Sequence, residues 1–143
     1  MAEPTDDQLD KLGAAFDAFA RRYKLADPNG AAKPLNEIDK YALRFVAEHP
    51  GCGPTDVARF LSVPTTTASS ATDRLAKRGL IERDRVEGDR RAVALRLSKA
   101  GEAVVANLMS THRSLTRVML QRLSPTERDA FIKIITKIVY YDN

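Results

Sequence analysis

Residues 64–101 read PTTTASSATDRLAKRGLIERDRVEGDRRAVALRLSKAG, and this stretch decides the fold. Small or apolar residues recur in it at the three-and-four spacing of one helix face, at positions 68, 71, 72 and 75. Gly79 follows at the place where a left-handed residue ends a helix. The pattern predicts a helix over 65–78 whose opposite face is polar at its start and cationic towards its end.

Two strand-like segments follow this helix, over 80–86 and 90–97, and flank the turn-like Glu87-Gly88-Asp89. The second segment alternates apolar with small or charged residues, which is the period of a half-buried strand. The two segments predict a hairpin with arginines at its tip. A polar helix beside a basic hairpin is the layout of a winged helix-turn-helix, in which the helix enters the DNA major groove and the wing meets the backbone or minor groove.

The positive charge of the chain is concentrated in the same region. Residues 74–99 hold nine Lys or Arg against four Asp or Glu, while the whole chain has a net charge of +4. The remainder is therefore close to neutral. A local basic excess is expected of a surface that meets phosphates. Charge alone fits a solvated helix face and hairpin equally well.

Composition indicates one globular subunit. The chain has 143 residues, of which 43% are hydrophobic and 29% charged. No apolar run approaches the roughly 20 residues of a membrane span, and the start MAEPTDDQLD lacks the regions of a signal peptide. We therefore expect a cytoplasmic protein without a membrane partner.

The sequence predicts neither a metal site nor a catalytic site. Cys52 is the single cysteine, and His49 and His112 are the only histidines, so no Cys/His cluster has metal-ligand spacing. No Ser/His/Asp arrangement, phosphate loop or pair of catalytic carboxylates is found in the sequence. We expect no cofactor and no enzymatic activity.

Helices are predicted on both sides of this stretch. An apolar stripe predicts a first helix over about 5–25, and the Pro- and Gly-containing residues 26–35 predict a loop. Asn36 is a candidate N-cap of a second helix that ends before His49, with Ile38, Tyr41, Ala42, Phe45 and Val46 as its apolar face. A third helix begins at Gly53-Pro54 and reaches Leu61, which completes a helix-turn-helix.

Two more helices are predicted after the hairpin. Ser98 is placed to cap a long helix that reaches about Leu123. Ser124-Pro125-Thr126-Glu127 then combines a serine N-cap, a proline at N1 and a glutamate at N3, the signature of a capping box. Phe131, Ile134, Ile135 and Ile138 form the apolar face of this last helix.

The apolar stripes of the first, fifth and last helices predict a homodimer, because the winged module between them already has its own core. We expect a mainly α (α+β) fold for a single subunit, 1–143. Its helical dimerisation lobe comprises 5–35 and 98–143, and its DNA-binding lobe comprises 36–97. A two-fold dimer would match a pseudo-palindromic DNA site.

The chain resembles the MarR family of transcriptional regulators over nearly its whole length. The resemblance rests on Asp73-Arg74-Leu75 with Lys77-Arg78-Gly79-Leu80-Ile81-Glu82-Arg83, on Asp89-Arg90-Arg91, and on Leu97-Ser98 with Gly101. These resemble the end of the family's recognition helix, its D-x-R wing signature and the L-T-x-x-G start of its long helix. The resemblance implies a dimeric repressor of pseudo-palindromic promoter sites on double-stranded DNA, released by a small aromatic or lipophilic anionic effector that binds between the two lobes.

The resemblance and the charge pattern together nominate site residues. The DNA-binding candidates are Thr65, Thr66, Thr67, Ser69, Ser70, Asp73, Arg74, Lys77, Arg85, Asp89, Arg90 and Arg91. Arg91 would be the wing arginine that reaches the minor groove, and Asp89 would orient it. The effector-pocket candidates are Phe16, Phe19, Tyr23, Tyr41, Arg44 and Phe45.

Some alternatives stay open at this level. The hydroxyls of 65–70 also suit helix capping, and Ser70 is shorter than the polar side chain common at its position in the family. Cys52 lies in a loop, where we expect a small, partly exposed residue, whereas peroxide-sensing relatives carry a reactive cysteine near the first helix. A winged-helix module used only for protein contacts is the alternative function.

Overall fold

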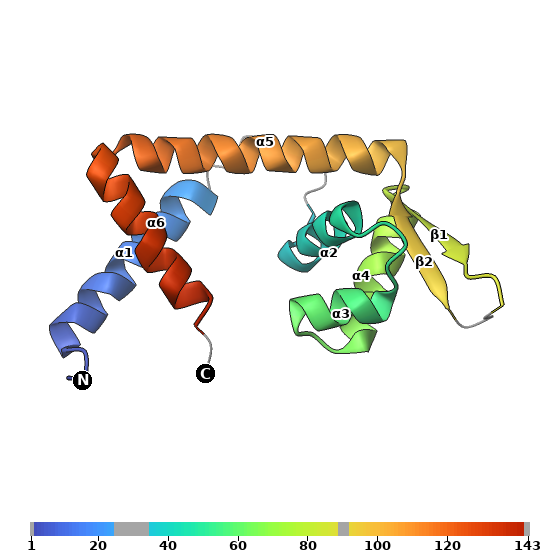
Figure 1. Cartoon of the computed structure of the whole chain (residues 1–143), viewed down its shortest axis with the longest axis horizontal. Helices are drawn as coiled ribbons and strands as arrows, with labels where there is room; N and C mark the ends of the chain where they lie inside the picture. The colour runs from blue at the N-terminus through green and yellow to red at the C-terminus, as the bar shows by residue number, and fades with distance from the viewer. Residues whose placement is uncertain (1, 25–34, 89–91, 142–143) are drawn as a thin grey trace. The chain divides into compact units, whose positions relative to one another are not determined.

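A computed structural model of the protein describes residues 2–24, 35–88 and 92–141 (Figure 1). Its elements are α1 (Asp6–Lys24), α2 (Glu37–Glu48), α3 (Pro54–Leu61), α4 (Thr65–Lys77), β1 (Ile81–Arg85), β2 (Val93–Leu97), α5 (Lys99–Gln121) and α6 (Pro125–Val139). The predicted order of elements is confirmed, with ends that differ from the predicted ends by a few residues at most. The chain divides into two compact units, Met1–Leu35 and Asn36–Asn143.

The first unit contains α1. Asp6 and Asp7 lie in its first turn, where negative charge is favourable next to the unsatisfied amide groups. Leu9, Leu12 and Phe16 on its predicted stripe are all more than half exposed. The rings of Phe19 and Tyr23, one turn apart, lie 4.8 Å from each other. The predicted stripe is therefore present and presents apolar surface.

The second unit has its core where α2, α3, α4 and the hairpin meet. Its largest fully buried side chains are Leu43, Leu75, Leu95, Val46, Val57 and Thr72. The predicted inner face of α4 is confirmed, whereas that of α2 needs a correction: Leu43 is buried and Tyr41 is exposed. The reason is that α2 contacts α3 and α4 as well as β2 and α5, so a wider arc of this helix is covered.

The hairpin is the predicted antiparallel pair, and the loop before α3 joins it. Ile81 pairs with Leu97, and Arg85 pairs with Val93. The Gly51 amide donates to the Leu95 carbonyl at 2.7 Å, and the Leu95 amide donates to the Cys52 carbonyl at 2.8 Å. Cys52 is buried, so the expectation of a partly exposed loop residue is wrong. These two backbone hydrogen bonds hold the loop against the edge of β2.

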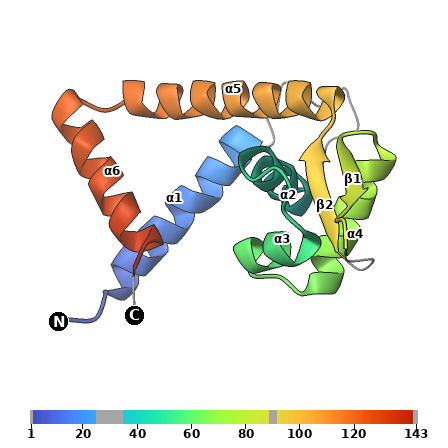
Figure 2. The ribbon, with the colours of Figure 1, turned by 45° about the vertical axis from the view of Figure 1, so that its right-hand side comes forward.

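A tight joint connects α4, the hairpin and the start of α5 (Figure 2). Gly79 has φ +73°, the left-handed geometry predicted for the residue after α4. The Ser98 hydroxyl donates to the Gly79 carbonyl at 2.5 Å and accepts from the Gly101 amide at 3.0 Å, so Ser98 caps α5 as predicted. Gly101 is buried against the Leu80 carbonyl, which leaves no room for a Cβ.

The last helix begins with the predicted capping box. The Ser124 amide donates to Glu127, and the Glu127 amide donates to the Ser124 hydroxyl. Arg128 donates through Nε to the Leu120 and Leu123 carbonyls, which ties the first turn of α6 to the end of α5. The apolar residues of α6, Phe131, Ile132, Ile134, Ile135, Ile138 and Val139, are all exposed. No helix within the described ranges is both long enough and apolar enough to cross a membrane.

Candidate nucleic-acid interface

The outer face of α4 carries the hydroxyl groups that the sequence nominates. Ala68, Ala71, Thr72 and Leu75 are buried on the inner face. Their burial turns Thr65, Thr66, Ser70, Asp73 and Lys77 outward as exposed residues, while Thr67 and Ser69 are half-buried at the margin. Short polar side chains on an exposed helix face are compatible with close approach to the edges of base pairs.

The hydroxyls of 65–70 do not cap α4. The N-cap is Pro64, whose carbonyl accepts from the Ala68 amide at 3.1 Å, and no side chain in the described residues caps this helix. The helix-capping interpretation of this run is therefore wrong. Because an uncapped first turn leaves backbone N–H groups without helical partners, it suits contact with a phosphate oxygen.

Arg74 has a structural partner that sequence reasoning missed. Its Nε and Nη2 donate to the two carboxylate oxygens of Asp39 on α2, at 3.0 and 2.8 Å. The Asp39 side chain is 5% exposed and that of Arg74 is 46% exposed. Hydrogen bonding to Asp39, and then its charge, raise the pKa of Arg74 against the opposing effect of partial burial. The pair joins the predicted recognition helix to α2, and Nη1 takes no part in these two hydrogen bonds.

Asp39 lies in the first turn of α2, where an acidic side chain is favourable on the surface of the helix as well. The missed signal is its position, because Asp39 lies three and four residues before the core residues Ala42 and Leu43. A carboxylate on a core-facing arc requires a hydrogen-bonded or charged partner. The sequence does not say which of the many arginines supplies it.

Other ion pairs link α4 to the hairpin and brace the hairpin itself. Arg83 on β1 pairs with Asp73 on α4 at 2.5 Å. Arg96 on β2 reaches Glu82 at 3.1 Å and Asp84 at 3.2 Å across the strands. The predicted DNA-facing Asp73 is thus positioned to hold a basic side chain of the hairpin. All these groups are about half exposed, so each pair adds little to stability.

Two nominated cations lie apart from these pairs. Lys77 at the end of α4 and Arg85 at the end of β1 are exposed, and neither forms an ion pair within the part of the chain that the structure describes. Both therefore remain available for phosphate oxygens. The predicted wing contacts Asp89, Arg90 and Arg91 lie outside the described residues.

The effector-pocket candidates divide between the two units. Tyr41, Arg44 and Phe45 line one small pocket of about 130 Å³, together with Glu48 and Phe60. The Arg44 Nε is buried and has no hydrogen-bond partner among the described residues. Phe16, Phe19 and Tyr23 belong to α1 in the other unit. No cluster of three or more potential metal ligands is found within the described residues.

Comparisons with known proteins agree with this geometry. The sequence profile of the MarR family matches residues 34–92. The chain is 28% identical over 127 residues to the HTH-type transcriptional regulator YwhA of Bacillus subtilis, covering 89% of this chain and 91% of YwhA. It is 31% identical over 118 residues to the regulator PecS of Dickeya dadantii, covering 82% of this chain and 66% of PecS.

The fold also matches that of a protein whose crystal structure was solved with DNA bound. The crystal structure of Streptococcus pneumoniae FabT with DNA superposes with a TM-score of 0.79 and covers 92% of both chains, at 22% sequence identity. At that identity the likeness concerns the fold. The family profile, the 31% identity to PecS and the match to YwhA over 89% of this chain show that the chain belongs to the MarR family of winged helix-turn-helix transcriptional regulators.

Proposed function

We propose that this protein is a dimeric, sequence-specific repressor that binds pseudo-palindromic promoter sites on double-stranded DNA in the cytoplasm. In this proposal it is a ligand-responsive regulator and not an enzyme. The observation that carries the proposal is the outer face of α4, where exposed hydroxyls lie on the same helix as the exposed Lys77; Arg85 is a further exposed cation, at the end of β1. Such a face combines base-edge contacts with phosphate contacts.

The nominated residues have different roles in this proposal. Thr65, Thr66, Thr67, Ser69 and Ser70 face base edges and the nearest phosphates, and Lys77 and Arg85 neutralise phosphates. Ser70 cannot make the bidentate base contact of Arg, Asn or Gln, so discrimination relies on threonine methyl contacts, bridging water and DNA shape.

The wing completes the contact to DNA. Arg91 enters the minor groove beside Arg90, with Asp89 orienting it. Arg74 is first a positioning residue through the hydrogen bonds of Nε and Nη2 to Asp39, and Nη1, which takes no part in them, would contact a phosphate. The crystal structure of FabT, which shares this fold, is a complex with DNA, and this supports DNA as the partner in the proposal.

The proposed dimer uses the lobe formed by 5–35 and 98–143 and leaves 36–97 to bind DNA. The exposed apolar stripes of α1 and α6 support it, because a second subunit would remove them from water. Each subunit would then present one α4 to one half-site about one helical turn from the other.

The proposed effector is a small aromatic or lipophilic anion. Tyr41, Arg44 and Phe45 would contact it from α2, with Phe16, Phe19 and Tyr23 from α1. The buried Nε of Arg44, which has no partner among the described residues, supports an anion as the missing acceptor. Screening of aromatic carboxylates by thermal shift, followed by a DNA-release assay, tests this part; the absence of a compound active in both assays would contradict it.

Titration of promoter duplexes at several salt concentrations tests DNA binding. Lys77→Ala should weaken binding to all duplexes alike and reduce the salt slope by about one, because one phosphate contact is lost. Arg91→Ala should weaken the binding free energy for the specific promoter site by roughly 1–3 kcal/mol and leave binding to unrelated duplexes unchanged. Lys137→Ala on α6 is the matched control and should leave both quantities unchanged.

The alternative function predicts a different result in the same titration. A winged-helix module for protein contacts would bind unrelated duplexes equally and with little salt dependence. Equal affinity for the promoter and a scrambled duplex at all salt concentrations would therefore contradict the proposed repressor.

A further inference from the structure

Asp73 is an acidic residue in the middle of the surface that the proposed function brings to DNA. It lies about one helical turn after Ser70 and one turn before Lys77, and all three side chains are on the exposed face of α4. A carboxylate at this place repels phosphate oxygens and by its charge alone weakens DNA binding. Its role is indicated by its partner within the protein, Arg83 on β1.

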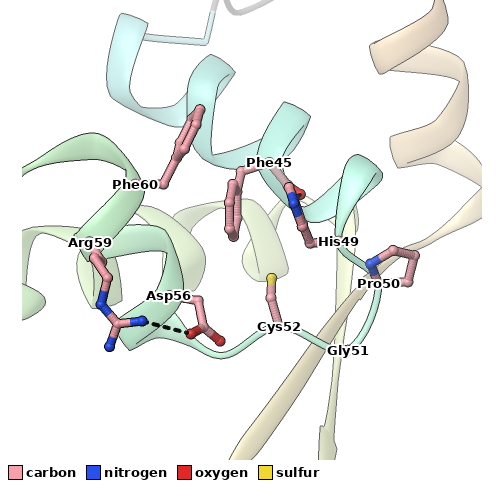
Figure 3. A pocket seen from close by; sticks show the side chains of 8 residues that line it. All are labelled: Phe45, His49, Pro50, Gly51, Cys52, Asp56, Arg59 and Phe60. Carbon is pink, nitrogen blue, oxygen red and sulfur yellow. Dashed lines mark hydrogen bonds and ion pairs between the residues drawn. The ribbon is translucent and has the colours of Figure 1, made fainter. Parts of the chain in front are cut away.

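The ion pair of Asp73 and Arg83 connects two elements of the DNA-binding lobe. Arg83 Nη1 donates to Asp73 Oδ1 at 2.5 Å, from β1 to α4. By contrast, Figure 3 shows Arg59 paired with Asp56 inside α3, where an ion pair cannot position one element against another. The side chains of Arg83 and Asp73 are 45% and 55% exposed, so their pair adds little to the free energy of unfolding. Its main consequence is for the orientation of β1 relative to α4.

The two strands of the hairpin are held to different degrees. The loop before α3 exchanges two backbone hydrogen bonds with Leu95, in the middle of β2. Leu95 is also fully buried. In β1, every residue after Ile81 is exposed. The pair of Arg83 with Asp73 therefore acts on the strand that the core holds less firmly.

The two faces of β1 carry opposite charges. Successive side chains of a strand point to opposite faces, so Arg83 and Arg85 share one face and Glu82 and Asp84 share the other. Both acidic side chains reach Arg96 on β2, at 3.1 and 3.2 Å. The ion pair with α4 shows that the basic face is the one turned towards that helix. The ion pair therefore keeps Arg85 on the α4 side of the hairpin.

We propose that Asp73 is a positioning residue for sequence-specific binding: through Arg83 it fixes the hairpin against α4, so that both elements meet DNA at one spacing. Elements that are fixed before binding lose less conformational entropy on DNA. The repulsion of the carboxylate acts on every duplex, whereas the fixed spacing favours the duplex whose grooves fit it. Asp73 thus raises the ratio of specific to non-specific affinity. This inference rests on the proposed function.

Anisotropy titrations of the full-length protein measure this ratio with two duplexes. One is enriched by the original protein from a random-sequence pool, and the other is a scrambled copy of it. Asp73→Asn should weaken binding to the enriched duplex about threefold and strengthen binding to the scrambled duplex about twofold. Charge alone predicts tighter binding of both duplexes, because the variant removes a negative charge. Tighter or unchanged binding of the enriched duplex would overturn the proposal.

Glu82→Gln is the matched control. It makes the same change of charge on the other face of β1, and Arg96 keeps Asp84 as a partner. The ratio of the two affinities should stay unchanged in this variant. Asp73→Glu, which keeps the carboxylate, should retain most of the ratio. A ratio that falls as far in Glu82→Gln as in Asp73→Asn would show a general effect of charge and overturn the role of the ion pair.

A double-mutant cycle separates positioning from a direct contact to a base. Arg83→Gln should lower the ratio as much as Asp73→Asn does, and the double variant should lower it no further, because the two residues act as one pair. Additive losses, with the Asp73→Asn loss confined to one base pair of the site, would overturn the proposal in favour of a cytosine contact by the carboxylate.

An NMR measurement without DNA distinguishes failure of this inference from failure of the proposed function. Residual dipolar couplings of the β1 amides, measured against those of α4, should change in Asp73→Asn and stay unchanged in Glu82→Gln. Unchanged couplings in both variants would overturn the inference even where the protein binds DNA specifically. If no duplex is enriched from the pool, the proposed function fails, and the couplings still decide whether Asp73 fixes the hairpin.

Discussion

The ion pair between Arg74 and Asp39 gives Arg74, a residue of the predicted DNA-binding helix α4, a role in the stability of the fold. Arg74→Leu should lower the free energy of unfolding by roughly 2–3 kcal/mol, because it leaves a buried carboxylate without its partner. Replacing both residues with leucine should recover much of this loss, since the uncompensated charge is removed as well. Urea unfolding of the two single variants and the double variant measures the coupling. Additive losses would show that the pair contributes nothing as a pair.

Cys52 is the other residue whose surroundings decide its chemistry. Burial, and then the charge of Asp56, raise the pKa of the Cys52 thiol. The thiol should therefore stay protonated near neutral pH and react with iodoacetamide several-fold more slowly than an unfolded cysteine. Asp56→Asn, which keeps an oxygen for the Gly53 amide, should speed the reaction. Mass spectrometry is unambiguous because the chain has a single cysteine.

The same pKa shift predicts the sign of a pH effect on stability. The unfolded chain ionises its thiol at lower pH than the folded chain does. The contribution of Cys52 to the free energy of unfolding is therefore complete below the ordinary cysteine pKa. It is lost as the pH rises through the higher pKa that the thiol has in the folded protein. Rapid alkylation of Cys52 at neutral pH would contradict this account and would reopen a thiol-sensing role.

At the scale of elements, the joint between the hairpin and α5 depends on one glycine. A Cβ at Gly101 would lie 1.9 Å from the Leu80 carbonyl oxygen, and backbone atoms cannot yield without moving a helix or a strand. Gly101→Ala should destabilise the protein by about 2–3 kcal/mol. It should also weaken DNA binding, because Leu80 precedes β1 and Gly79 follows α4.

Gly13 provides the matched control for this joint. Nothing lies within 4 Å of a Cβ built at Gly13 in α1. Gly13→Ala should therefore stabilise the helix by about 0.5–1 kcal/mol through backbone entropy. Urea midpoints that move in the same direction for both variants would contradict the steric account of Gly101.

At the scale of the whole molecule, the exposed apolar face of α6 predicts self-association. Light scattering coupled to gel filtration should give twice the 15.8 kDa subunit mass. The double variant Ile134→Asp, Ile138→Asp should give a monomer, because it places charges in a face that a partner would cover. It should also lose most affinity for a two-half-site duplex, since the half-sites are then bound independently.

Lys133→Asp is the matched control, because position 133 lies about 100° from Ile134 and about 140° from Ile138 around the axis of α6. This variant should remain dimeric. A monomeric original protein, or a dimer that survives both isoleucine substitutions, would remove α6 from the proposed interface.

Local signals made the elements predictable. The periods of 3.6 and 2, the Ser98 cap and the Ser124 capping box each act within a few residues, and the structure has them where the sequence places them. The left-handed backbone of Gly79 was predictable for the same reason, because it depends on the conformation of this one residue after α4. The outward face of α4 followed from its periodicity for the same reason.

The sequence by itself therefore determined the order of the elements, the winged helix-turn-helix and the polar face of α4. Only the tertiary structure decided that Arg74 pairs with Asp39, 35 positions away, and that Cys52 is buried at the edge of β2. Caps and periods depend on neighbours along the chain, whereas a buried carboxylate or thiol depends on which distant group packing brings against it. The sequence contains several arginines that could pair with Asp39. Arg74 is the one that does so, because α4 packs on α2.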